Sequence, residues 1–264
     1  MSRGWSIIRV VPVAPRRQPV TDALRPDTNH RRDARTAGVL IIALMLLTLA
    51  GFYPTYISKF PTFDGATNVH HFHGAMMMIW FSLLVVQPLL IAYQKYDLHR
   101  TLGKLSYLVA PVVLYSIFLA SQHEYYRDRT HLTEHESLAG LSLDISSLMA
   151  FGVCYVLAII NRKNTPLHMR YMIGTALIIM GPGIMRIIAV YDVFGDISFP
   201  TVVQYTQLIC AGIGLALVVH DLTQSKPYKP YLIAVGLTVG IYLIYLNRMS
   251  AWWLAVAGAI ASVF

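Results

Sequence analysis

Apolar runs long enough to cross a lipid bilayer recur along this chain, and they constrain its fold more than any other feature. About 17–25 mostly apolar residues form a helix that spans the hydrocarbon layer. Such runs occur at residues 37–57, 69–93, 103–122, 137–160, 169–190, 200–219 and 231–247. In lipid, a helix satisfies its own backbone hydrogen bonds. The sequence therefore predicts an all-α fold, a polytopic transmembrane helix bundle of about seven spans in the cell (inner) membrane.

The two ends of the chain differ from this pattern. Residues 1–36 hold eight arginines and no apolar core, so we do not expect them to act as a secretory signal peptide. We expect a disordered basic arm on the cytoplasmic side over residues 1–36 and a transmembrane helical domain over residues 37–250. An apolar C-terminal tail follows over residues 251–264, in which Trp252 and Trp253 are typical of anchors at a membrane interface.

Charged residues between the spans predict the orientation of the chain. Cytoplasmic loops carry an excess of Lys and Arg. The loops at 94–102, 161–168 and 220–230, with their flanks, carry Lys95, Arg100, Lys104, Arg162, Lys163, Arg170, Lys226 and Lys229, whereas the opposite loops are mainly acidic. We therefore expect a cytoplasmic N-terminus. The net charge of +8 then reflects topology, so we expect the lipid bilayer and no nucleic acid as a partner.

Two charged residues, Asp144 and Arg186, lie inside the apolar runs. Arg186 follows a Gly-Pro-Gly segment at residues 181–183 that loosens its helix. The two residues differ in depth by about 5 Å at 1.5 Å per helical residue. A lone charge inside a membrane is costly and usually has a partner. We therefore predict an ion pair between Asp144 and Arg186, with either a structural or a functional role.

Histidines gather at the ends of the spans, most densely in VHHFHG at residues 69–74. The first interpretation is a b-type haem, which axial histidines from two helices hold in membrane bundles. His73 then pairs with His135, and His99 pairs with His168. Arg100, Lys104 and Arg170 are then available for the propionates of the inner haem, between His99 and His168. The chain is then a membrane redox protein that transfers electrons to or from a quinone or small reductant, with a quinone or a respiratory protein as its partner.

The second interpretation is a bare metal ion, in a membrane-embedded enzyme with its site on the outer side. The candidate ligands are His70, His73, His123, His131 and His135, with Glu124, Glu134 and Glu136 adjacent. Imidazole suits Zn, Cu and Fe, and carboxylates favour harder ions. His73 shares a helical face with Trp80 and Gln87, so we expect it to matter most in HHFH, with His70 second and His71 least.

The third interpretation assigns no chemistry to the histidines. They contact loops and lipid headgroups, and the chain is a non-catalytic accessory or transport protein. Cys154 and Cys210 lie inside apolar runs, which is typical of buried thiols rather than of a disulfide or a cysteine metal site.

Two segments, LHRTLGKLSYL (98–108) and TPLHMRYMIGTALIIMGPGIMRI (165–187), resemble an uncharacterised family of bacterial multi-spanning membrane proteins, a domain of unknown function. In that family, an HR-x-x-G segment opens one span, and an H-x-R-x-M segment opens another that ends in an intramembrane arginine. The matching residues here are His99, Arg100, Gly103, Lys104, His168, Arg170, Met172 and Arg186. The resemblance implies a multi-spanning helical fold and no particular activity.

A more distant resemblance is to cytochrome b561-type proteins, whose four-helix core carries histidines on alternate helices. It implies haem ligation by His73, His99, His135 and His168, which fall in that order on the second to fifth spans. Here these histidines lie at the ends of the spans, whereas the cytochromes carry theirs further in. Two haems so placed lie far apart for direct electron transfer, so one haem is expected rather than two.

Overall fold

The computed structural model describes residues 28–264, and this part of the chain forms nine α-helices, one short 3-10 helix and no strand. The helices are α1 (Thr28–Phe52), η2 (Ile57–Lys59), α2 (Asn68–Ala92), α3 (Tyr96–Asp128), α4 (Glu134–Ile160), α5 (Thr165–Ile179), α6 (Gly181–Val190), α7 (Phe199–Thr223), α8 (Lys229–Leu246) and α9 (Ala251–Ala261). Seven segments are long and apolar enough to cross a membrane, with α5 and α6 together forming the fifth. The predicted all-α bundle with seven membrane-capable spans is confirmed.

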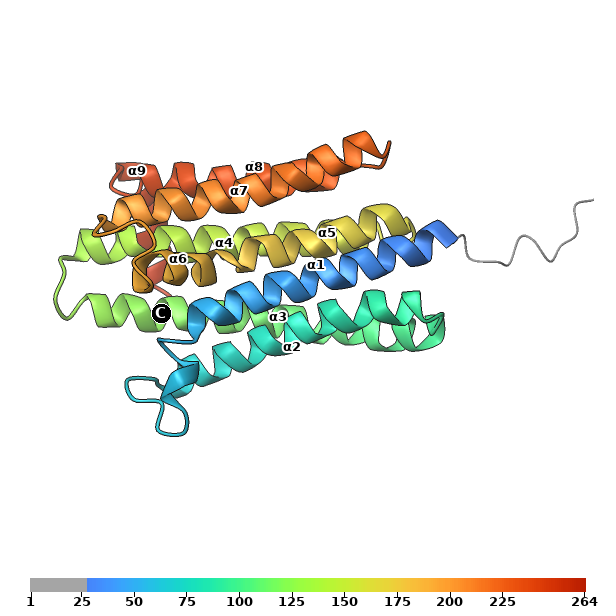
Figure 1. The fold of residues 1–264 in the computed structure, drawn as a ribbon. Helices are drawn as coiled ribbons and strands as arrows, with labels where there is room; N and C mark the ends of the chain where they lie inside the picture. Colours follow the sequence, from blue (N-terminus) through green and yellow to red (C-terminus); the bar gives the residue numbers. More distant parts are fainter. Residues whose placement is uncertain (1–27) are drawn as a thin grey trace, which may run out of the picture.

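The long helices lie side by side along one direction (Figure 1). Helix α2 packs between α1 and α3, and α8 covers α4, α5 and α7. One end of the bundle carries the loops at residues 53–67, 129–133 and 191–198. The other end carries the loops at residues 93–95, 161–164 and 224–228. We call them the outer and the inner end after the sides of the membrane that the sequence predicts, and this sidedness stays a prediction.

The first helix begins earlier than its apolar run. Residues 1–27 of the expected basic arm lie outside the described residues, whereas residues 28–36 form the first turns of α1. Polar contacts at the inner end hold these turns. Arg31 donates to a carbonyl at the end of α2 at 3.3 Å, and Asp33 pairs with Lys226 at 2.8 Å. The helix therefore continues through charged residues that we had assigned to the arm.

Trp80 of α2 lies at the centre of the bundle. Its side chain is fully buried and makes edge contacts with the rings of Phe151 and Tyr155 on α4. The indole N–H donates to the Thr175 hydroxyl on α5 at 3.1 Å, so the one polar atom of this ring is satisfied. The middle of the bundle is thus closely packed around Trp80, and the groups capable of chemistry lie towards its two ends.

The Gly-Pro-Gly segment interrupts the fifth span, as the sequence predicts, and it also sets the position of α6. Helices α1 and α6 cross so closely that a Cβ atom on Gly51 would overlap the carbonyl of Gly183. A Cβ atom on Gly183 would lie 2.7 Å from the Cα atom of Thr48. The two backbones meet only because both positions lack a side chain.

The C-terminal tail forms a separate helix, α9, that packs on α4 instead of extending the last span. Trp253 is buried and donates its indole N–H to the Leu138 carbonyl at 3.2 Å, whereas Trp252 is exposed. The ring of Phe264 stacks against Tyr125 of α3 with 5.6 Å between centroids. The tail therefore joins the outer ends of α3 and α4.

Candidate metal centre at the outer end

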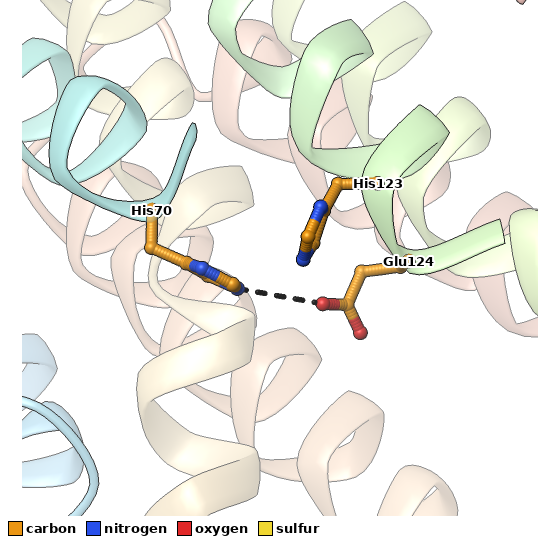
Figure 2. A group of neighbouring side chains, drawn as sticks. All are labelled: His70, His123 and Glu124. Atoms are coloured by element: carbon orange, nitrogen blue, oxygen red, sulfur yellow. Dashed lines mark ion pairs between the residues drawn. The ribbon is translucent and has the colours of Figure 1, made fainter. Parts of the chain in front are cut away.

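Three side chains with metal-binding atoms meet where α2 begins and α3 ends. His70 comes from the first turn of α2, and His123 and Glu124 come from the last turns of α3. One ligand atom from each residue can be chosen so that all three atoms lie within 4.8 Å of one another. Figure 2 shows the His70 ring and the Glu124 carboxylate facing each other across the gap between the helices, with the His123 ring beside them. All three residues are half-buried.

The start of α2 fixes the orientation of the His70 ring. Thr67 is the N-cap residue, and its backbone N–H donates to His70 Nδ1 at 3.0 Å. Because Nδ1 accepts this bond, the neutral ring carries its hydrogen on Nε2. His70 Nε2 lies 3.6 Å from Glu124 Oε1, and the His70 and His123 rings meet edge to face at 4.9 Å. The capping arrangement therefore turns Nε2 towards α3.

Glu124 is held from its other side by Arg127. Its Oε2 atom lies 2.5 Å from an Arg127 Nη2 atom, and the same Nη2 atom lies 2.9 Å from Asp128 Oδ1. Asp128 thus shares the positive charge of Arg127. The Glu124 carboxylate is fixed through Oε2, while Oε1 faces the two imidazoles.

This set of donors suits a transition metal. Two imidazoles and one glutamate are the protein ligands of some catalytic zinc sites, which keep a fourth position open for water or substrate. Coordination through His70 Nε2 requires the ring hydrogen to move to Nδ1, so metal binding must replace the bond from the Thr67 backbone N–H by one in which Nδ1 donates to the Thr67 hydroxyl, 2.9 Å away. A hydroxyl in that position supplies the hydrogen bond that ligating histidines usually make through their second nitrogen.

The remaining candidate ligands do not join this cluster. His131 and His135 are exposed, and His131 contacts the neighbouring Thr130 hydroxyl at 3.2 Å. Glu136 is taken up in the N-terminal cap of α4 with Thr133. Of the histidines predicted from the sequence as metal ligands, only His70 and His123 thus belong to the cluster.

His73 and His71 occupy different surroundings from His70. His73 Nδ1 lies 3.2 Å from the Ser116 hydroxyl on α3, which itself donates to the Val113 carbonyl at 2.7 Å. His73 Nδ1 is therefore the donor, and its Nε2 atom keeps an unshared lone pair. His71 faces the connection between α1 and α2, where its Nδ1 atom lies 2.5 Å from the Tyr56 hydroxyl. The structure brings His70, rather than His73, to the cluster.

The predicted haem ligands at the inner end are held by local hydrogen bonds. His168 Nδ1 lies 2.9 Å from the Ala158 carbonyl oxygen, to which it donates, so its Nε2 atom is left as an acceptor. His99 Nδ1 contacts the backbone carbonyl of Gln87 at 3.3 Å, and the Gln87 side-chain amide lies against the same ring. Both residues thus tie neighbouring helix ends together. At the outer end, His73 is half-buried whereas its expected haem partner His135 is exposed.

The basic residues assigned to haem propionates differ in availability. Arg170 is not free for this role, because it donates to both carboxylate oxygens of Asp221 on α7. Arg100 has only a contact of 3.5 Å with Asp97, and Lys104 is exposed. Asp221 is not among the residues predicted from the sequence, because it lies just beyond the sixth apolar run, which ends at residue 219. The His220–Asp221 pair directly after that run was the available signal.

The predicted ion pair between Asp144 and Arg186 is not formed. In the part of the chain that the structure describes, neither side chain makes a salt bridge. Arg186 instead lies over the Phe52 ring at 4.2 Å and donates to the Pro182 carbonyl at 3.2 Å. The close crossing of α1 and α6 explains the difference, because it brings Phe52 to the guanidinium.

No protein-family model, no curated protein and no solved structure matches this chain. The resemblances noted from the sequence therefore remain expectations, and the site must be interpreted from its own geometry.

Proposed function

We propose that this chain is a membrane-embedded, metal-dependent enzyme whose metal centre is formed by His70, His123 and Glu124. The observation that carries the proposal is the convergence of three ligand atoms within 4.8 Å from two different helices. The ligands lie at the outer end, where the substrate can arrive from the aqueous side or from the membrane surface. The two imidazoles suit Zn, Cu or Fe.

A bound divalent ion of this kind acts as a Lewis acid and lowers the pKa of water in its open position. The chain supplies the group that takes up the proton. His73 lies one turn beyond His70 on α2, and its Nε2 atom has an unshared lone pair because Ser116 orients the ring through Nδ1. His73 is thus the candidate general base.

Metal binding can be tested by thermal unfolding in detergent. Protein stripped with a chelator should unfold at a higher temperature once zinc is added, because a ligand that binds only the folded state stabilises it. Glu124→Gln removes a ligand charge and should abolish the shift. Glu134→Gln, at an exposed glutamate of the same end that pairs with Arg129, is the matched control and should keep it. A zinc shift of equal size in both variants would contradict the proposal.

A redox function with haem b remains a second candidate because of the inner end. His99 lies near the start of α3 and His168 near the start of α5, both at the inner end, and His168 Nδ1 donates to a carbonyl, which leaves its Nε2 atom as an acceptor. Electron exchange with a quinone or a respiratory partner then follows from the sequence interpretation. The visible spectrum of purified protein tests it: a Soret band that His168→Ala abolishes supports haem. Colourless protein that contains no metal supports an accessory or transport role instead.

A further inference from the structure

Two basic side chains at the inner end of α3 have little negative charge beside them. Arg100 and Lys104 are both exposed and lie about one turn apart on this helix. Arg100 has one contact with a carboxylate, at 3.5 Å from the fully exposed Asp97, and such a surface pair contributes little. Lys104 makes no salt bridge with a described residue. Asp97 therefore offsets only one of these two positive charges.

Other basic residues at the inner end are neutralised within the protein. Arg170 pairs with Asp221 on α7, and Lys226 pairs with Asp33 on α1. These carboxylates thus hold their own partners and belong to contacts between helices. The two cations on α3 differ, because they face outwards and keep their charge for a partner outside the chain.

The exposed face of α3 continues from these cations as an apolar surface. Leu108, Pro111 and Tyr115 follow Lys104 at spacings of three and four residues, so these side chains share one helical face. Leu108 is 68% exposed and Tyr115 is 56% exposed. Other faces of α3 pack against α2 and α4. The face below the cations is therefore turned away from the bundle, which in a membrane means towards the lipid.

The length of this face matches one leaflet of a bilayer. Tyr115 follows Lys104 by eleven residues, which is about 16 Å along an α-helix. Half of the hydrocarbon core of a bilayer is about 15 Å thick. Lys104 also lies at the start of the apolar run of this span, which begins at residue 103. The two cations thus lie at the level of the lipid headgroups, and the apolar face lies at the level of the acyl chains.

We infer that this face of α3 binds an anionic phospholipid, such as phosphatidylglycerol, from the leaflet at the inner end. Arg100 and Lys104 bind the phosphate through charge-assisted hydrogen bonds. An acyl chain lies along Leu108, Pro111 and Tyr115. A zwitterionic lipid carries a cation of its own beside the phosphate, so two cations with little counter-charge favour a lipid with a net negative charge. The site is independent of the metal centre, which lies at the outer end.

The test uses delipidated protein in a maltoside detergent at about 0.15 M salt, with dioctanoyl phosphatidylglycerol as the probe. The lipid should raise the unfolding temperature of the parent in a concentration-dependent way, because it binds the folded protein. The double variant Arg100→Gln/Lys104→Gln should need about tenfold more lipid for the same shift. Arg100→Lys/Lys104→Arg retains both charges and should respond like the parent. The unfolding temperature without lipid shows whether each variant is folded.

Arg162→Gln/Lys163→Gln is the matched control. This variant removes the same number of exposed charges from the same end, but from the connection between α4 and α5 instead of from a helix face that continues into lipid. It should bind phosphatidylglycerol like the parent. An equal loss of binding in the two double variants would reduce the effect to general charge attraction and overturn the inference. Phosphatidylglycerol without any effect on the parent would overturn it too.

Two further probes separate the lipid from other ligands. Dioctanoyl phosphatidylcholine has the same chains without a net charge, and we expect it to bind about tenfold more weakly. Glycerophosphoglycerol is the headgroup without acyl chains, and it should cause no shift at the concentrations at which the lipid acts. Equal shifts with phosphatidylcholine would show that the face does not select anionic lipid. Equal shifts with glycerophosphoglycerol would assign the two cations to soluble anions, and either result would contradict the inference.

Discussion

Arg170 on α5 and Asp221 on α7 form a buried, bidentate ion pair near the inner end of the bundle. The guanidinium donates to both carboxylate oxygens at 2.5 and 2.9 Å, and a further N–H donates to the Pro166 carbonyl at 3.0 Å. Arg170 is 3% exposed and Asp221 is 2% exposed. The pair joins two spans that make few other contacts with each other.

Breaking this pair should destabilise the protein strongly. Asp221→Asn leaves a buried guanidinium without its counter-charge, and such changes cost about 3–5 kcal/mol. Thermal unfolding in detergent should therefore show a clearly lower midpoint for Asp221→Asn. Asp97→Asn serves as the control, since Asp97 and its partner Arg100 are both exposed, and it should unfold like the parent. A midpoint for Asp221→Asn that matches the parent would show that the pair contributes no stability.

From the close crossing of α1 and α6 we predict that the two glycines beside Pro182 differ in how well they tolerate a side chain. Gly183→Ala places a methyl group 2.7 Å from the Cα atom of Thr48, so the helices must separate. Overpacking of this kind costs about 1–3 kcal/mol. Gly181→Ala, two residues earlier, meets no atom within 4 Å and should be tolerated. The unfolding midpoints of the two variants should differ accordingly, and a tolerated Gly183→Ala would argue against this crossing.

The orientation in the membrane can be tested with a single cysteine. Arg129→Cys lies in the loop between α3 and α4, and the natural thiols, Cys154 and Cys210, are both buried. We expect a membrane-impermeant maleimide to label this variant on intact cells, because the distribution of Lys and Arg places the loop outside. Labelling that requires permeabilised cells would reverse the topology and place the metal centre in the cytoplasm.

Hydropathy predicts where the spans lie in the sequence, but it does not predict where their helices begin and end. The sequence places the third span at residues 103–122, whereas α3 runs from Tyr96 to Asp128. An apolar run ends at the hydrocarbon boundary, and a helix continues beyond it while its backbone bonds are satisfied. This extension matters for the site, because His123 and Glu124 lie on the added turns and are therefore held by a helix instead of a loop.

The partners across helices were harder to predict. Hydropathy and helical periodicity gave His73 as the leading histidine of HHFH, because it shares a face with Trp80. The structure brings His70 to His123 and Glu124 instead, since α2 and α3 meet at their outer ends in a particular rotation and register. In the same way, Arg186 stacks on Phe52 and forms no salt bridge with Asp144, because two glycines determine the crossing of α1 and α6. The relative rotation and register of two packed helices cannot be read from a single sequence.

The central claim, a metal centre made by His70, His123 and Glu124, is tested most directly by elemental analysis. The measurement is the number of Zn, Cu and Fe ions per chain in purified parent protein and in single variants. We predict about one ion per chain in the parent and loss of most of it in His70→Ala, His123→Ala and Glu124→Gln, because each variant removes one of three protein ligands. The exposed histidine variant His131→Ala should retain the ion. A metal-free parent, or equal and full occupancy in all four variants, would contradict the account.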